Sequence, residues 1–272
     1  MTLFDQILKA RGLEGEARDL FLSPSYEAKH DPFLLPDMQA AVDRLAIARE
    51  QQQRITIYGD YDIDGLTATT VLLDALESFG FLHVDAFIPN RFVEGYGLTL
   101  DAVERIAETG AQLIVTVDCG SLSEKEIIRA NELGVDVIVT DHHNVAPVQP
   151  PAIAVINPKR LLADYPEAYE NYLLNTAKLS DTYQLPSTQV YPFVDLPGVG
   201  VAFKLVQALQ TRLDGLPVGQ EKWLLDLVAL GTVCDVVTLV DENRANVYWG
   251  LKVLSQTRRP GLKALMAVAA VE

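Results

Sequence analysis

Short apolar runs alternate with amphipathic stretches through the middle of the chain. The strand-like runs cover residues 55–57, 83–88, 113–117, 135–140 and 152–156, and the amphipathic stretches between them cover residues 67–79, 100–109 and 123–133. Strands separated by helices of this length favour right-handed crossovers, which place neighbouring strands in parallel. The pattern therefore predicts an α/β fold with a parallel sheet flanked by helices on both faces.

The regions on either side of this core lack strand-like runs. Residues 1–53 predict a helical leader, with helices at 3–11, 17–22 and 38–51 separated by glycine and proline. After residue 190 the pattern predicts a mostly helical region, with helices at 201–212 and 220–230 and another that begins at residue 248. We thus expect a leader (1–53), an α/β core (54–158), an insertion (159–190) and a helical remainder (191–272).

The insertion is a long connection rich in tyrosine, leucine and asparagine. We expect an added helix over residues 163–179. Long connections of this kind are commonly functional loops, extra helices or disordered segments. Two interpretations stay open: the segment gates a substrate groove or contacts a partner, or it is a tolerated surface insertion.

Composition narrows the class of protein. With 272 residues, 49% of them hydrophobic, and a mean hydropathy of +0.13, the chain has enough apolar surface for a large core. Its longest apolar runs are far shorter than the roughly 20 residues that span a bilayer, and the first residues lack the pattern of a secretory signal. Two cysteines are too few for a disulfide framework and indicate a reducing compartment. We expect a globular, cytoplasmic protein without a membrane partner.

Three carboxylates stand at alternate positions directly after the first strand-like run. Asp60, Asp62 and Asp64 would lie on one side of the chain if the strand continued through them. Their mutual repulsion calls for a bound cation. The alternative interpretation is an Asp/Gly turn that closes the strand, and these residues alone do not decide between the two.

Other polar residues follow apolar runs further along the chain. Asp118 follows the run at 113–117, and Asp141, His142 and His143 follow the run that ends at residue 140. Asp235 follows the apolar residues 230–234. Residues just past the carboxyl ends of parallel strands converge at one edge of a sheet, so we expect these segments to form one pocket. Neutral imidazole is a common metal ligand, although a polar helix cap is an alternative for Asp141 to His143.

Together these segments resemble the DHH phosphoesterase superfamily and, within it, the RecJ group of single-strand-specific exonucleases. The four matching motifs are residues 58–65, 117–120, 141–143 and 231–239. Residues 89–97 and 196–204 resemble the RecJ group more narrowly. The resemblance extends over residues 54–240 in the order of the family, and it covers the catalytic DHH region only.

The resemblance implies metal-dependent hydrolysis of single-stranded DNA from its 5′ end, in DNA repair or recombination, with two divalent cations. Oxygen and imidazole ligands favour manganese first and magnesium second. By resemblance, Asp118 bridges the two ions, Asp62 holds one, and Asp64, His142 and Asp235 hold or flank the other. The resemblance also assigns His143 to the scissile phosphate, Asp141 to orienting the imidazoles, and Asp60 to either a ligand or a supporting role. Some relatives carry histidine where this chain has Tyr58, which leaves the coordination of the first ion open.

The overall charge argues against nucleic-acid binding, whereas a few individual residues favour it. The chain has 22 Lys and Arg against 37 Asp and Glu, a formal net charge of -15, which argues against long-range attraction of nucleic acid. Two divalent ions would invert the field locally. Four basic residues could still form a local positively charged path for the strand: Arg91, Lys204, Arg258 and Arg259. The alternative is that they are ordinary solvated surface residues. Gly198 and Gly200 precede the helical run at 201–212, where a glycine turn either exposes backbone N–H groups that cradle a phosphate or simply forms a tight entry to the helix.

Two other functions stay open. A small-molecule phosphatase or short-oligonucleotide phosphodiesterase of the same superfamily would use the same metal ligands, and it suits the acidic charge. The matches at 89–97 and 196–204 argue against it. A catalytically silent DHH scaffold in a replication or repair assembly is the third hypothesis, and the nearly complete Asp and His set argues against that one.

Overall fold

The computed structural model describes residues 2–27, 29–164 and 191–270. The strands are β1 (Ile55–Gly59), β2 (Val84–Phe87), β3 (Leu113–Val117), β4 (Asp136–Thr140) and β5 (Ala154–Ile156). The helices before and among them are α1 (Leu3–Ala10), α2 (Gly15–Leu22), α3 (Met38–Glu50), α4 (Ile63–Ser78), α5 (Leu100–Glu108), α6 (Glu124–Glu132) and α7 (Arg160–Asp164), with a 3-10 turn η1 (Pro32–Leu34). The later helices are α9 (Gly198–Leu209), η2 (Gln220–Leu224), α10 (Leu225–Cys234), α11 (Asp241–Leu254) and α12 (Pro260–Val268).

The five strands form one parallel sheet in the order β2-β1-β3-β4-β5. Every residue of β1 and β3 is buried, because the side chains of a central parallel strand are covered on both faces. In β3, Val115 joins the core on one face of the sheet and Ile114 joins the core on the other. The predicted α/β fold with a parallel sheet flanked by helices is thus confirmed.

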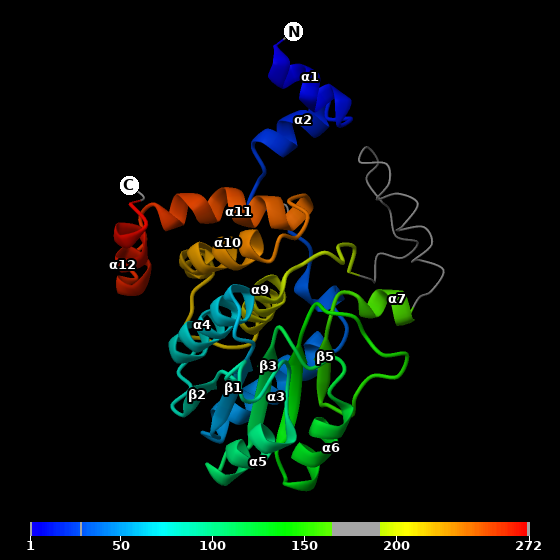
Figure 1. Ribbon diagram of the computed structural model, residues 1–272, viewed down its shortest axis with the longest axis vertical. Helices are drawn as coiled ribbons and strands as arrows, with labels where there is room; N and C mark the ends of the chain where they lie inside the picture. Colours follow the sequence, from blue (N-terminus) through cyan, green and yellow to red (C-terminus); the bar gives the residue numbers. More distant parts are fainter. Residues whose placement is uncertain (1, 28, 165–190, 271–272) are drawn as a thin grey trace.

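Helices cover the sheet in two unequal layers (Figure 1). On one face, α5 and α6 contribute to a smaller core that includes Val103 and Ile127. On the other, α3, α4 and α9 belong to the larger core, and α10 packs on α4 and α9. Helix α11 packs on α10 on the side away from the sheet (Figure 1). The carboxyl ends of the strands therefore point toward a helical layer built mainly from the C-terminal part of the chain.

Two element boundaries differ from the prediction, and both bear on the site. Helix α4 begins at Ile63, whereas the hydrophobic pattern placed its start at residue 67. The earlier start arises because the Asp62 carboxylate accepts the Gly65 N–H at 2.9 Å and caps the helix. Asp235 follows helix α10, not a strand, so the expectation of a strand-end position was wrong for this residue.

Part of the predicted insertion falls within the described residues. Asn157 and Pro158 are followed by the short helix α7, and Tyr191 begins the next described segment. The helix expected over 163–179 lies outside the described residues apart from its first two positions. Within the described residues, no helix combines the length and apolar character that crossing a bilayer requires.

Candidate metal centre

The first acidic motif divides between a loop and a helix. Asp60 follows β1 and is buried, Asp62 is the exposed cap of α4, and Asp64 lies buried in the first turn of that helix. Because the chain turns into α4 at this point, the three carboxylates do not stay on one side of an extended strand. The condition for a shared side, a strand that continues through all three residues, is not met. The helix start instead directs Asp64 to a different set of neighbours, while Asp60 and Asp62 stay together.

Asp118 occupies a left-handed backbone position directly after β3. Its φ is +61°, a conformation that aspartate adopts more readily than most residues, and its side chain is buried. Gly198, the first residue of α9, lies so close that an added Cβ would sit 2.7 Å from Asp118 Oδ1. The start of α9 therefore requires glycine here to approach the Asp118 carboxylate.

Asp141 holds the segment after β4 through backbone and side-chain hydrogen bonds. Its carboxylate accepts the N–H groups of Ser121 at 2.9 Å, His142 at 2.7 Å and His143 at 3.1 Å, and it lies 2.9 Å from His143 Nδ1. Burial by itself would raise the pKa of this carboxyl, but the contacts with His143 and the N–H groups lower the pKa to about 2. Asp141 stays ionised and fixes the His143 ring.

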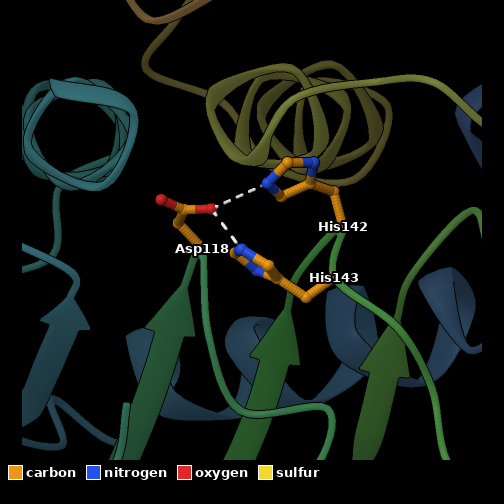
Figure 2. A group of neighbouring side chains, drawn as sticks. All are labelled: Asp118, His142 and His143. Atoms are coloured by element: carbon orange, nitrogen blue, oxygen red, sulfur yellow. Dashed lines mark ion pairs between the residues drawn. The ribbon is translucent and has the colours of Figure 1, made fainter. Parts of the chain in front are cut away.

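Residues from all four motifs meet around His142 and Asp118. Figure 2 shows the Asp118 carboxylate at the end of β3, directed toward both imidazole rings. Its Oδ1 lies 3.1 Å from His142 Nε2 and 3.8 Å from His143 Nδ1. His142 also lies 3.8 Å from Asp64 Oδ2 and, through Nδ1, 3.7 Å from Asp235 Oδ2. Four of the five predicted metal ligands are thus brought together by these contacts, and Asp62 lies with Asp60 and Asp118 in the group described next.

Among the described residues, three groups of side chains have ligand atoms that lie within 4.8 Å of one another. The first group is Asp60, Asp62 and Asp118, the second is Asp64, His142 and Asp235, and the third is Asp118, His142 and His143. The first two groups share no residue, while Asp118 and His142 of the third link them. This arrangement matches two adjacent ion positions with Asp118 between them.

Four buried atoms of this cluster lack a hydrogen-bond partner. They are Asp60 Oδ1, Asp118 Oδ1, His142 Nε2 and Asp235 Oδ2. Asp118 Oδ1 and His142 Nε2 lie 3.1 Å apart as an ion pair, but they do not form a hydrogen bond of normal geometry. Buried polar atoms are normally paired, so such a concentration indicates a ligand that satisfies them. Oxygen and imidazole donors of this kind fit a manganese or magnesium ion, and the residues present therefore fit the implied cations.

The pKa values of the cluster reflect burial and like charge. Burial, followed by the nearby Asp118, raises the pKa of Asp64 to about 8, and burial, followed by Asp62, raises the pKa of Asp118 to about 9. Burial lowers the pKa of His142, whereas the hydrogen bond with Asp141 raises the pKa of His143 to about 9. A divalent cation would remove the repulsion that keeps these carboxyls protonated.

The structure corrects most of the predicted substrate contacts. The N–H groups of Gly198 and Val199, at the start of α9, donate to Asp64 at 2.6 and 2.8 Å, so this helix end holds a carboxylate of the protein. Gly200 is buried against Pro197. The Gly198 N–H is occupied by Asp64 and Gly200 is buried in the first turn of α9, so the tight-entry alternative describes these glycines better.

Two of the four predicted basic residues are likewise engaged elsewhere. Lys204 is buried and donates to Glu242 Oε1 at 2.6 Å and to the His30 carbonyl at 2.7 Å, so it does not reach a substrate. Arg259 pairs with Asp74 and Asp226. Arg91 remains exposed, with its guanidinium 4.7 Å from the centre of the Tyr61 ring, beside Asp60 and Asp62.

Several residues near the site escaped sequence reasoning. Tyr96 places its hydroxyl 3.1 Å from both ring nitrogens of His143. Asn157 is buried after β5 and donates to Ser121 Oγ at 2.8 Å and to the His143 carbonyl at 2.9 Å. Both carried a signal, because Tyr96 lies in the stretch 89–97 that resembles the RecJ group and Asn157 directly follows the strand-like run 152–156.

Tyr58 does not replace the histidine that some relatives carry. It is fully buried in the core on the α5 side of the sheet, with its ring stacked on Phe87. Its hydroxyl donates to the Gly97 carbonyl at 2.8 Å. Tyr58 therefore anchors the end of the 89–97 loop, and it belongs to none of the ligand groups described above.

Comparisons with known proteins agree with this geometry. The model of the "DHH family, N-terminal domain" matches residues 54–232. The single-stranded-DNA-specific exonuclease RecJ of Bacillus subtilis (strain 168) is 41% identical over 268 residues, which cover 98% of this chain and 30% of that protein. The chain thus spans less than a third of the length of that relative.

Two solved structures share the fold. A crystal structure of exonuclease RecJ bound to manganese superposes with a TM-score of 0.67 at 35% identity, over 86% of this chain and 52% of that one. RecJ from Thermus thermophilus, in complex with Mn²⁺, gives a TM-score of 0.71 at 31% identity, over 97% of this chain and 33% of that one. The match to the family model covers more than half of the sequence, and the chain belongs to the DHH family.

Proposed function

We propose that this chain is the metal-dependent catalytic region of a RecJ-type exonuclease, which hydrolyses phosphodiester bonds of single-stranded DNA from the 5′ end. The observation that carries the proposal is the set of four buried ligand atoms without a hydrogen bond, at the point where three strand ends and α10 converge. The named relatives supply the substrate and, for two solved structures, the metal. A role in DNA repair or recombination and a cytoplasmic location follow from the same proposal.

The ligand groups suggest a division of labour at the centre. Asp60 and Asp62 would hold one ion, Asp64, His142 and Asp235 the other, and Asp118 would bridge them. Bound divalent cations would lower the pKa of a coordinated water and neutralise charge that develops on the phosphate. The N–H groups of α9 keep the Asp64 carboxylate in place, which limits the reorganisation needed when an ion binds.

His143 is the residue best placed to meet the scissile phosphate. Its side chain is 43% exposed, whereas that of His142 is 9% exposed, so only His143 opens toward solvent at the rim. Asp141 raises the pKa of His143 to about 9 and so keeps the imidazolium cationic at neutral pH. A cation held there would pair with a phosphate oxygen. Arg91, on the neighbouring loop, would contribute a second phosphate contact.

One assay tests this proposal against the small-molecule alternative. That alternative gains from the structure, because Lys204 and the start of α9 are not available to a strand. The chain would be incubated with end-labelled single-stranded DNA or a dinucleotide, with manganese or with chelator. We expect manganese-dependent release of nucleotides from the 5′ end of the strand. A clear preference for the dinucleotide, with little response to salt, would overturn the choice of substrate.

Loss of all activity in chelator is the control for the metal. An inactive chain in manganese, on every substrate, would favour the scaffold alternative. To separate that outcome from poor retention of the strand, the assay would be repeated with excess enzyme at low salt, where weak phosphate contacts are strongest.

A further inference from the structure

Both tryptophans of the chain lie together on the helical side of the molecule. Trp223 belongs to η2 and Trp249 to α11, and the sequence contains no other tryptophan. They line one hollow of about 420 Å³, together with Tyr26, Lys222 and Lys252. Leu225 at the start of α10 also lines it, while Asp235 follows the other end of that helix, roughly 15 Å away at 1.5 Å per residue.

Trp223 stands between this hollow and a second one. The second hollow has a volume of about 430 Å³ and is lined by Trp223, Gln220, Thr257 and Arg258 among others. The Trp223 residue is 50% exposed, although exposed tryptophan is uncommon in a protein surface. An indole with open space on two sides offers stacking surface to planar groups.

Uncompensated positive charge coincides with these aromatic rings. Lys252 Nζ lies 4.0 Å from the centre of the Trp249 ring, and the Arg258 guanidinium lies 5.8 Å from that of Trp223. Within the part of the chain that the structure describes, no carboxylate lies within ion-pair distance of either cation. The other cations of the two hollows are paired, Lys222 with Glu27 and Arg259 with Asp226. Lys252 and Arg258 therefore carry the positive charge that is left over at these rings, in a chain with a formal charge of -15. The surface is therefore suited to a ligand that is both anionic and aromatic.

We propose that the two hollows around Trp223 form a second contact site for single-stranded nucleic acid, apart from the metal centre. Bases would stack on Trp223, and phosphates would pair with Lys252 and Arg258, a combination that binds strands without regard to sequence. An acidic peptide satisfies the cations but does not use the stacking surface. The choice of nucleic acid rests on the proposed function, which supplies a single strand as substrate.

Tryptophan fluorescence tests the site directly, since both reporters line it. In chelator, where the strand is not hydrolysed, an oligothymidylate of about 15 nucleotides should quench the emission in a saturable manner. A Lys252→Ala/Arg258→Ala variant should bind the strand about tenfold more weakly. The matched control is Lys125→Ala/Lys263→Ala, which removes the same charge from exposed positions that line neither hollow. Trp223→Ala should weaken binding as well, which the remaining fluorescence of Trp249 reports.

The outcomes separate this site from the metal centre. With manganese, the Lys252→Ala/Arg258→Ala variant should hydrolyse a dinucleotide at the wild-type rate but show a higher KM for a long strand. If the wild type hydrolyses neither substrate, the proposed function fails, while quenching still tests this site. The site is overturned if the strand gives no saturable quenching, if the control variant loses as much affinity, or if polyglutamate of equal length binds as tightly.

Discussion

The metal centre and the Lys204–Glu242 pair both place ionisable side chains in the protein interior, with opposite results. Lys204 and Glu242 are 2% and 3% exposed and lie 2.6 Å apart, and Glu242 also accepts the His30 N–H. At the centre, Asp118 and His142 are also buried, but they retain atoms without a hydrogen bond. Burial alone does not distinguish structure from function here, whereas the concentration of unsatisfied carboxylate and imidazole atoms at one place does. The Lys204–Glu242 pair holds helices together, and the Asp and His cluster is suited to a cation.

The largest expected effect follows from removing the shared ligand of the unsatisfied cluster. Asp118→Asn keeps the size and the left-handed backbone of residue 118, because asparagine also adopts positive φ. It removes the charge between the two ligand groups. We expect manganese-dependent hydrolysis to fall about a hundredfold or more, since even residues behind the ligands cost about 10- to 100-fold. Initial rates at saturating manganese measure it, and an unchanged rate would refute the bridging role.

Substitutions in the Lys204–Glu242 pair should change the free energy of unfolding and leave the hydrolysis rate unchanged. Lys204→Met leaves the Glu242 carboxylate buried without its partner, which typically costs about 3 to 5 kcal/mol of unfolding free energy. Chemical denaturation of the metal-free protein measures the change. The double variant Lys204→Met/Glu242→Gln should recover most of the loss because no charge stays unpaired. Weaker manganese binding in the folded double variant would show that Lys204 serves the centre after all.

The two histidines should differ in what they lose. His142 belongs to two of the ligand groups and is nearly buried, so His142→Ala should weaken manganese binding by about tenfold or more. His143 is fixed by Asp141 and opens to solvent, so His143→Ala should lower kcat while affinity for the metal changes less. Manganese titrations followed by thermal unfolding, together with kcat, separate the roles. Equal loss of metal affinity in both variants would contradict this assignment.

The smallest effect concerns pH in the absence of metal. Burial, followed by Asp62, raises the folded-state pKa of Asp118 to about 9, above its ordinary value near 3.9. A carboxyl with a raised folded-state pKa costs the folded state more as pH rises between these values. In chelator at pH 8, Asp118→Asn should therefore unfold with about 1 to 3 kcal/mol more free energy than the wild type. At pH 5 the difference in unfolding free energy should largely vanish. A difference that stays constant with pH would contradict the raised pKa of Asp118 as its cause.

The fold was largely predictable because each strand is an apolar run of its own. The α4 boundary was missed because its first turn, with Asp62 and Asp64, carries polar cap residues in place of helical periodicity. The convergence of the Asp and His residues was predictable from the family motifs. The hydrogen-bond partners of Asp64 were not predictable, because Gly198 and Val199 belong to a helix that is distant in sequence. Lys204 was misassigned, although a single lysine within the wholly buried α9 indicates an internal ion pair.

Counting the bound ions tests the central claim most directly. Equilibrium dialysis against manganese would be performed on the wild type and on Asp118→Asn, with Lys204→Met/Glu242→Gln as the control for a change in the paired cluster. The ligand groups predict two ions per wild-type chain, two in the control, and fewer in Asp118→Asn. A wild type that binds no manganese, or an Asp118→Asn variant that binds as many ions as tightly, would contradict the account.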